Sequence, residues 1–240
     1  MPLPKISTPT YELVLPSTGK KISYRPFLVR EEKLLVLALE SENTKEITTA
    51  IKNVLKACIQ TRGVKVEQLP TFDIEYLFLN IRGKSVGEEI EVNILCPDDG
   101  GDTYVPVKIN IDEIEVKKNK DHTPIIKLDD TLSMELKYPS LSEFIKNNFD
   151  FSEDKQMEAS FEMVATCIDK IYSEEEVWDS SDCTKKELLD FLEQMNSAQL
   201  KQVEFFFETM PKLTHTVKVT NPTTQIESEV NLEGLSSFFA

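Results

Sequence analysis

The sequence is poor in the residues that most enzyme sites require. Its 240 residues include only two histidines, seven glycines and four cysteines. Histidine is the usual base beside a serine or cysteine nucleophile. We place His122 in a polar linker and His215 at the start of a strand, both as ordinary surface or edge residues. Residues 83–87, Gly-Lys-Ser-Val-Gly, lack the spacing of a phosphate-binding loop and are interpreted as a turn between a helix and a strand. The sequence therefore favours a protein that is not an enzyme.

Basic charge and long apolar runs are also scarce. Forty-two acidic side chains against 27 basic ones give a formal net charge of −15. Binding to nucleic acid requires clustered Lys and Arg, so we expect neither nucleic acid nor an anionic membrane as a partner. No apolar run approaches the ~20 residues of a membrane span, and residues 1–5 lack the features of a secretory signal. The composition predicts a soluble, cytosolic protein whose partners present basic or apolar surfaces.

The cysteines and one acidic loop are the candidates for metal binding. The cysteines are far apart in sequence, which predicts free and mostly buried thiols: Cys58, Cys96, Cys167 and Cys183. The loop at residues 98–102 is rich in the carboxylates that hard cations prefer, but its spacing does not match an EF-hand. Cys96 resembles half of a zinc knuckle without the second thiolate. We expect no metal and no cofactor. A metal-dependent hydrolase that uses Asp98, Asp99 and Asp102 is a remote alternative.

Periodicity along the chain predicts an α+β fold. Strand-like alternation bounded by turn residues predicts three hairpins, within 11–24, 90–111 and 216–232. Helical spacing predicts helices at 30–41, 44–60, 72–81 and 153–172, with further helices after 184 and 197 and two short strands at 125–128 and 132–137. The expected architecture is two helical clusters that each carry a β-hairpin, plus an N-terminal hairpin. We assign their cores to aromatic helices through Phe72, Leu77, Phe78, Val203, Phe206 and Phe207.

A polar stretch without periodicity, residues 117–124, marks the predicted domain boundary. It separates an N-terminal α+β domain, 1–116, from a mainly helical C-terminal domain with a terminal hairpin, 125–240. An aromatic helix followed by a hairpin occurs on both sides of this linker. An internal duplication is therefore one interpretation, and chance alternation is the other.

The C-terminal end is unusually apolar. Chain ends are commonly polar and frayed, yet Leu235, Phe238 and Phe239 fall within the last six residues. We expect these side chains to dock a partner protein. The alternative is that they fold back and cover the C-terminal hairpin.

Several stretches resemble one family of proteins: residues 9–21, 24–28, 72–87 and 206–213. They are similar to the baseplate hub subunits and hub assembly proteins of T-even-type contractile-tailed phages. The resemblance implies a viral protein that is made in the host bacterial cytoplasm and binds other baseplate hub or tail assembly proteins. The resemblance implies no catalytic residue in this sequence. It leaves open a transient chaperone and a stable virion subunit.

Overall fold

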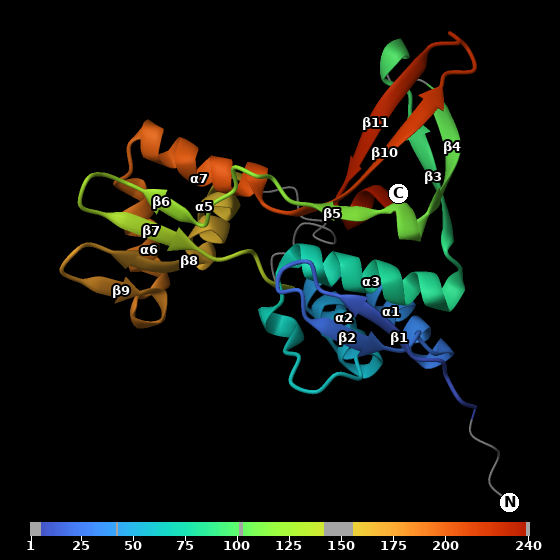
Figure 1. The fold of residues 1–240 in the computed structure, drawn as a ribbon, viewed down its shortest axis with the longest axis horizontal. Coiled ribbons are helices and arrows are strands. Elements are labelled where there is room, and N and C mark those ends of the chain that lie inside the picture. The colour runs from blue at the N-terminus through green and yellow to red at the C-terminus, as the bar shows by residue number, and fades with distance from the viewer. Residues whose placement is uncertain (1–5, 42, 101–102, 142–155, 239–240) are drawn as a thin grey trace, which may run out of the picture.

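The computed structural model describes residues 6–41, 43–100, 103–141 and 156–238, and it confirms the α+β class. Figure 1 shows two lobes. Of the described residues, the first lobe contains those of 6–117 together with 212–238, and the second lobe contains residues 125–138 and 156–209. Leu141 packs in the cluster of the first lobe. Each lobe has its own cluster of buried apolar side chains.

The first lobe begins with a hairpin and two helices. Strands β1 (Tyr11–Val14) and β2 (Lys21–Tyr24) pair antiparallel, and α1 (Val29–Glu40) and α2 (Thr44–Cys58) follow. The apolar face predicted for α2 is buried, including Ile47, Ile51 and Leu55. A short 3-10 helix, η1 (Val66–Gln68), leads to α3 (Thr71–Val86).

Helix α3 lies at the centre of the first lobe, between the layer of β1, β2, α1 and α2 and the hairpins on its other side (Figure 1). Its buried residues lie all around the helix, as expected for a helix surrounded by protein. The helix is longer than predicted and includes Gly83. A Cβ at Gly83 would lie 2.8 Å from the Ile111 side chain, so glycine permits close packing against η3 (Ile111–Glu113). The helix ends at Gly87, where φ is +137°.

Two hairpins complete the first lobe. Strands β3 (Glu89–Leu95) and β4 (Tyr104–Asn110) form one, with η2 (Pro97–Asp99) at its tip. Strands β10 (Lys212–Thr220) and β11 (Glu227–Glu233) form the other, and β5 (Glu115–Lys117) joins the edge of β10. Val92 and Val217 belong to the same buried cluster, so the hairpins pack against each other. The chain then enters η5 (Leu235–Phe238).

The second lobe packs helices against a four-stranded antiparallel sheet of order β6-β7-β8-β9. Its strands are β6 (Ile125–Lys127), β7 (Ser133–Leu136), β8 (Ile168–Tyr172) and β9 (Val177–Asp179). Its helical elements are α5 (Gln156–Cys167), η4 (Ser180–Asp182), α6 (Lys185–Glu193) and α7 (Ser197–Thr209). The helix predicted over 153–172 is wrong from residue 168 onward. Ile171 of β8 pairs with Met134 of β7, and tertiary pairing of β-branched residues overrides the helical spacing.

The C-terminal hairpin lies in a different lobe from the one that the sequence predicts. Leu213, Val217, Val219 and Leu232 pack in the first cluster, although the predicted division assigns them to the domain at 125–240. The cause is the pairing of β5 with β10, in which Lys117 lies opposite Lys212. The chain leaves the first lobe at β5 and returns to it at β10. Alternation predicts the hairpin itself but not the sheet that it joins.

Residues 117–124, predicted as a polar linker, contribute to the junction between the lobes. His122 is half-buried and stacks on Tyr138 with ring centroids 5.5 Å apart. Its Nδ1 lies 3.0 Å from the Thr209 hydroxyl and its Nε2 lies 2.9 Å from the Tyr138 hydroxyl. Tyr138 also contacts Phe72 of α3 and Phe206 of α7. The expected surface position of His122 is therefore wrong, and an aromatic cluster connects the lobes.

Candidate interaction surfaces

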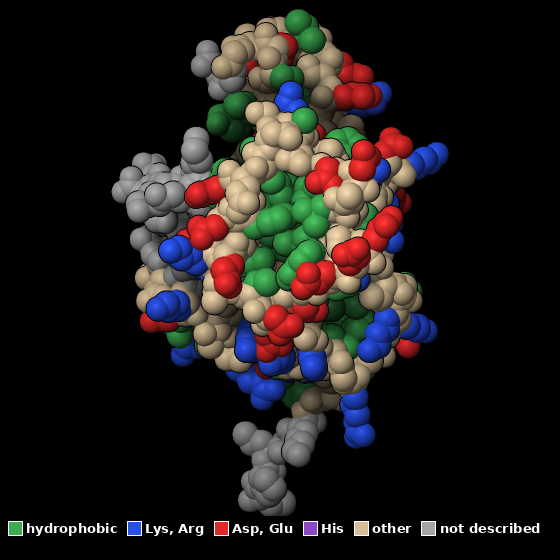
Figure 2. All heavy atoms as spheres, turned by 90° about the vertical axis from the view of Figure 1, so that its left-hand side faces the viewer, with side chains coloured by type: hydrophobic (Ala, Val, Ile, Leu, Met, Phe, Trp, Pro, Cys, Tyr) green, Lys and Arg blue, Asp and Glu red, His purple; other side chains and the backbone are tan. Residues whose placement is uncertain are grey.

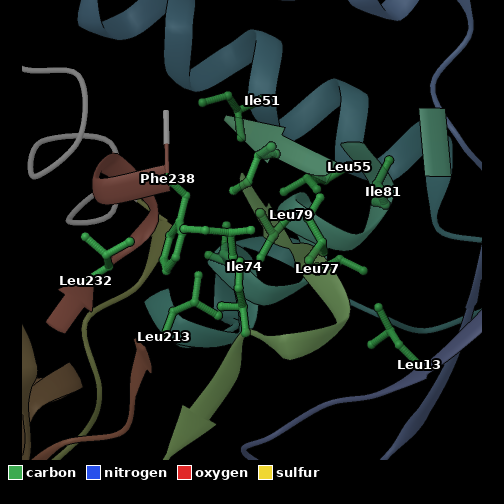
Figure 3. Packing of buried hydrophobic residues seen from close by; sticks show 14 of the residues in the cluster. Leu13, Ile51, Leu55, Ile74, Leu77, Leu79, Ile81, Leu213, Leu232 and Phe238 are labelled. Carbon is green, nitrogen blue, oxygen red and sulfur yellow. The ribbon is translucent and has the colours of Figure 1, made fainter. Parts of the chain in front are cut away.

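The apolar C-terminal end folds back onto the first lobe where the structure describes it. The Phe238 side chain is 1% exposed and belongs to the first cluster. Figure 3 shows its ring among the side chains around Ile74, Leu213 and Leu232. As placed, Phe238 completes the protein's own core and is not available to a partner. The side chain of Leu235 and all of Phe239 lie outside the described residues, so docking through them stays a prediction.

The acidic loop predicted as the best metal candidate contacts the tip of the other hairpin. Asn221 is fully buried, and its Nδ2 donates to both carboxylate oxygens of Asp98 at 3.2 Å and to Asp99 Oδ2 at 2.9 Å. Thr224 Oγ1 donates to Asp98 as well. The Asn221 Oδ1 accepts from the backbone N–H of Thr223 at 2.8 Å. The carboxylates of Asp98 and Asp99 therefore join two hairpin tips, whereas Asp102 lies outside the described residues.

The thiols do not approach one another as metal ligands. Cys58, Cys96 and Cys167 are buried and Cys183 is half-buried. Burial raises the pKa of the Cys58 thiol to about 11, so it stays protonated at neutral pH. Among the described residues, no group of three or more His, Cys, Asp or Glu side chains is placed to hold a metal ion.

Helix α1 presents large apolar side chains to solvent. Val29, Val36 and Leu37 share one face of the helix and are 80%, 48% and 53% exposed. Beside this face, Leu34, Leu37 and Ala38 line one wall of a groove of about 550 Å³, and Ala50 of α2 contributes to the other. Contiguous apolar surface on a folded protein commonly marks a site of protein interaction. We call Val29, Leu34, Val36 and Leu37 the α1 face.

A buried ion pair fixes the start of α1. Arg25 donates to Glu31 through two nitrogens, at 3.0 and 3.3 Å, and the Leu28 N–H donates to the same carboxylate at 2.7 Å. Arg30 Nε lies 2.7 Å from it. Burial acts to raise the pKa of Glu31, but the hydrogen bonds from Arg25, Arg30 and Leu28 prevail and lower it to about 2. The carboxylate stays ionised, and the α1 face is held in place from its first turn.

The second lobe has an apolar surface of its own. Figure 2, which faces the outer end of this lobe, shows hydrophobic side chains gathered at its centre and Asp and Glu side chains around them. The lobe's cluster includes partly buried Leu132 from the β6–β7 turn, Phe191 from α6 and Met195 beyond it. This surface combines an apolar centre with a mainly acidic rim.

One comparison with known proteins supports the coarser part of the resemblance noted above, that of a phage baseplate protein. A family model described as T4 bacteriophage base plate protein matches residues 8–240. The chain belongs to this family. No curated protein and no solved structure matches this baseplate protein. In the part of the baseplate protein that the structure describes, no helix has the length and apolarity needed to cross a membrane.

Sequence reasoning missed both apolar surfaces of the baseplate protein. The dense apolar content of residues 30–41 predicts a helix but does not tell which side chains the core leaves uncovered. The uneven distribution of acidic and basic residues along the sequence could have shown that the second lobe is the more acidic of the two. The described residues of this lobe, 125–138 and 156–209, contain 16 acidic and six basic side chains, a net charge of −10 out of the total of −15.

Proposed function

We propose that this baseplate protein is an assembly factor of the phage tail baseplate hub that acts through contacts with other proteins and without catalysis. Family membership supports a role in the baseplate, and the resemblance to hub proteins supports its central part. The observation that carries the proposal is the α1 face. The buried Arg25–Glu31 ion pair fixes the start of α1, and the apolar side chains of the α1 face are exposed to solvent. This arrangement is suited to contact with an apolar surface of a partner.

A stable structural subunit of the virion hub is the second candidate. Both candidates use the same kind of contact, and they differ in whether the protein remains in the finished particle. Mass spectrometry of purified tails separates them, because an assembly factor leaves and a structural subunit is present in fixed ratio to other baseplate proteins.

Co-purification from infected cells tests the proposal itself. We expect the tagged protein to retain baseplate proteins after crosslinking. The variant Val36→Gln with Leu37→Gln should lose them, because it makes the centre of the α1 face polar at two solvent-exposed positions. The control is Ile226→Gln, which changes a side chain that is 51% exposed at the tip of the β10–β11 hairpin. If the unmodified protein retains no baseplate protein, or if the α1 variant and the control behave alike, the proposal is wrong.

A further inference from the structure

The second lobe carries most of the negative charge of the protein. The net charge of −10 of its described residues comes from less than half of the chain, and the Asp and Glu side chains in Figure 2 surround the apolar centre of its outer end. An apolar centre stabilises a complex by being removed from water, and charges around it select the partner and raise the rate of association.

Three segments meet at this end. Leu132 closes the β6–β7 turn through the hydrogen bond from Leu128 N to its carbonyl, at 2.9 Å. The side-chain Nε2 of Gln199, in the first turn of α7, donates to the Leu128 carbonyl at 2.8 Å and so joins α7 to that turn. Phe191 and Met195 lie four residues apart, on one side of the end of α6 and the turn that follows. We call Leu132, Phe191 and Met195, with Asp129, Asp130 and Glu193 close to them in the sequence, the acid-rimmed patch.

The rim carboxylates are exposed to solvent. Asp130 is fully exposed, and its ion pair with Lys127 at 3.3 Å is correspondingly weak. Hydrogen bonds from the backbone and side chain of Thr131 and from the Leu132 backbone lower the pKa of Asp129. Glu193 is the last residue of α6, where a carboxylate opposes the negative end of the helix dipole, while Lys185 and Lys186 occupy the positive end. At that positive end Glu187 forms a stabilising capping box with Thr184, so the unfavourable charge at the other end is that of Glu193.

We propose that the acid-rimmed patch binds an amphipathic segment of a partner protein that places lysine or arginine beside large apolar side chains. The proposal rests on the proposed function in one respect, that the partners are proteins of the assembly. The negative charge of the patch argues against three other binding partners. A second copy of the chain would bring an equally acidic patch, and nucleic acid or an anionic membrane would be repelled in the same way.

Binding of a synthetic peptide to the full chain tests this. The probe is a fluorescent peptide of ~18 residues, about five helical turns, built of leucine and lysine in amphipathic order. A second peptide replaces leucine with serine, and a third replaces lysine with glutamate. Fluorescence anisotropy should show that the leucine–lysine peptide binds and that the other two bind at least about tenfold more weakly.

Charge reversal on the protein locates the binding. The variant Asp130→Lys with Glu193→Lys should weaken binding by about tenfold or more. The control Glu89→Lys with Glu91→Lys makes the same change of net charge at exposed positions of β3 in the first lobe, and it should weaken binding by less than about threefold. Met195→Gln should weaken binding with little change in its salt dependence, because it removes apolar contact and no charge.

Three results overturn the inference: no binding by the unmodified chain, equal losses in the two charge-reversal variants, or equal affinity for the serine–lysine peptide. The last two would mean that net charge alone attracts the probe. Co-purification distinguishes this failure from that of the proposed function. If baseplate proteins are retained equally by the unmodified chain and by Asp130→Lys with Glu193→Lys, the acid-rimmed patch is not used and the proposed function stands.

Discussion

Replacing Phe238 by alanine separates the two roles considered for the C-terminal end. The ring is 1% exposed within the cluster that α3, both long hairpins and β1–β2 share. Truncating a buried phenylalanine to alanine typically costs about 3–5 kcal/mol, and a domain is stable by only about 5–15 kcal/mol. We therefore expect Phe238→Ala to remove a large part of the stability of the first lobe.

Urea denaturation measured by two probes provides the assay. Circular dichroism reports on both lobes, whereas fluorescence of the only tryptophan, Trp178 on β9, reports on the second. Phe238→Ala should lower the midpoint seen by circular dichroism more than the midpoint seen by fluorescence. The matched control is Phe205→Ala on α7, a ring that is 44% exposed and should change stability by about 0.5 kcal/mol or less. An unchanged midpoint together with lost co-purification would refute the burial of Phe238 and restore it as a docking residue.

Three further predictions concern buried polar groups. Asn221→Ala should lower the free energy of unfolding by about 2–3 kcal/mol, because its amide hydrogen bonds to two carboxylates; urea denaturation checks this, with the exposed Asn231→Ala as the near-neutral control. Burial lowers the pKa of His122 in the folded state, so the unfolded state binds more protons and stability should fall as pH drops below the ordinary value of 6.5. This pH dependence should be smaller in His122→Gln, and equal slopes would contradict the assignment. Glu31→Gln should lose about 3 kcal/mol at neutral pH, since the pKa falls from 4.5 to about 2 on folding. The unmodified protein should keep this stability above pH 4.5 and lose it toward pH 2. The variant keeps other carboxylates whose pKa is lowered, such as Glu67 and Asp179, so it should lose less stability, not none, in thermal melts across that range.

Local patterns predicted the elements well where a single segment determines its own structure. Alternation located the three hairpins, and helical spacing located α2 with its buried face. The helix predicted after residue 184 is α6, and the Thr184 and Glu187 side chains form a capping box at its start. Burial of the predicted aromatic helices is also confirmed. Phe72, Leu77, Val203 and Phe206 are buried, and Phe78 and Phe207 are half-buried.

The errors share one physical cause, which is that contacts distant in sequence determine the outcome. Ile168 and Ile171 suit a helix by spacing, but pairing with β7 makes a strand. His122 lies in a polar stretch, yet the aromatic rings of Tyr138 and Phe206 surround it. The sequence likewise indicates that α1 is apolar without showing how much of it the core covers. Surfaces for partners were therefore the least predictable feature.

The return of the chain at β10 also affects how the protein is made. The first lobe lacks β10, β11 and Phe238 while the intervening segment is synthesised, because about 95 residues separate Lys117 from its pairing partner Lys212. At ~5–20 residues per second, a ribosome adds them in roughly 5–20 s. During that time the apolar side of the β3–β4 hairpin, including Val92, has no C-terminal hairpin to cover it. A chain terminated before β10 would keep that surface exposed, so a closed first lobe requires synthesis through Phe238.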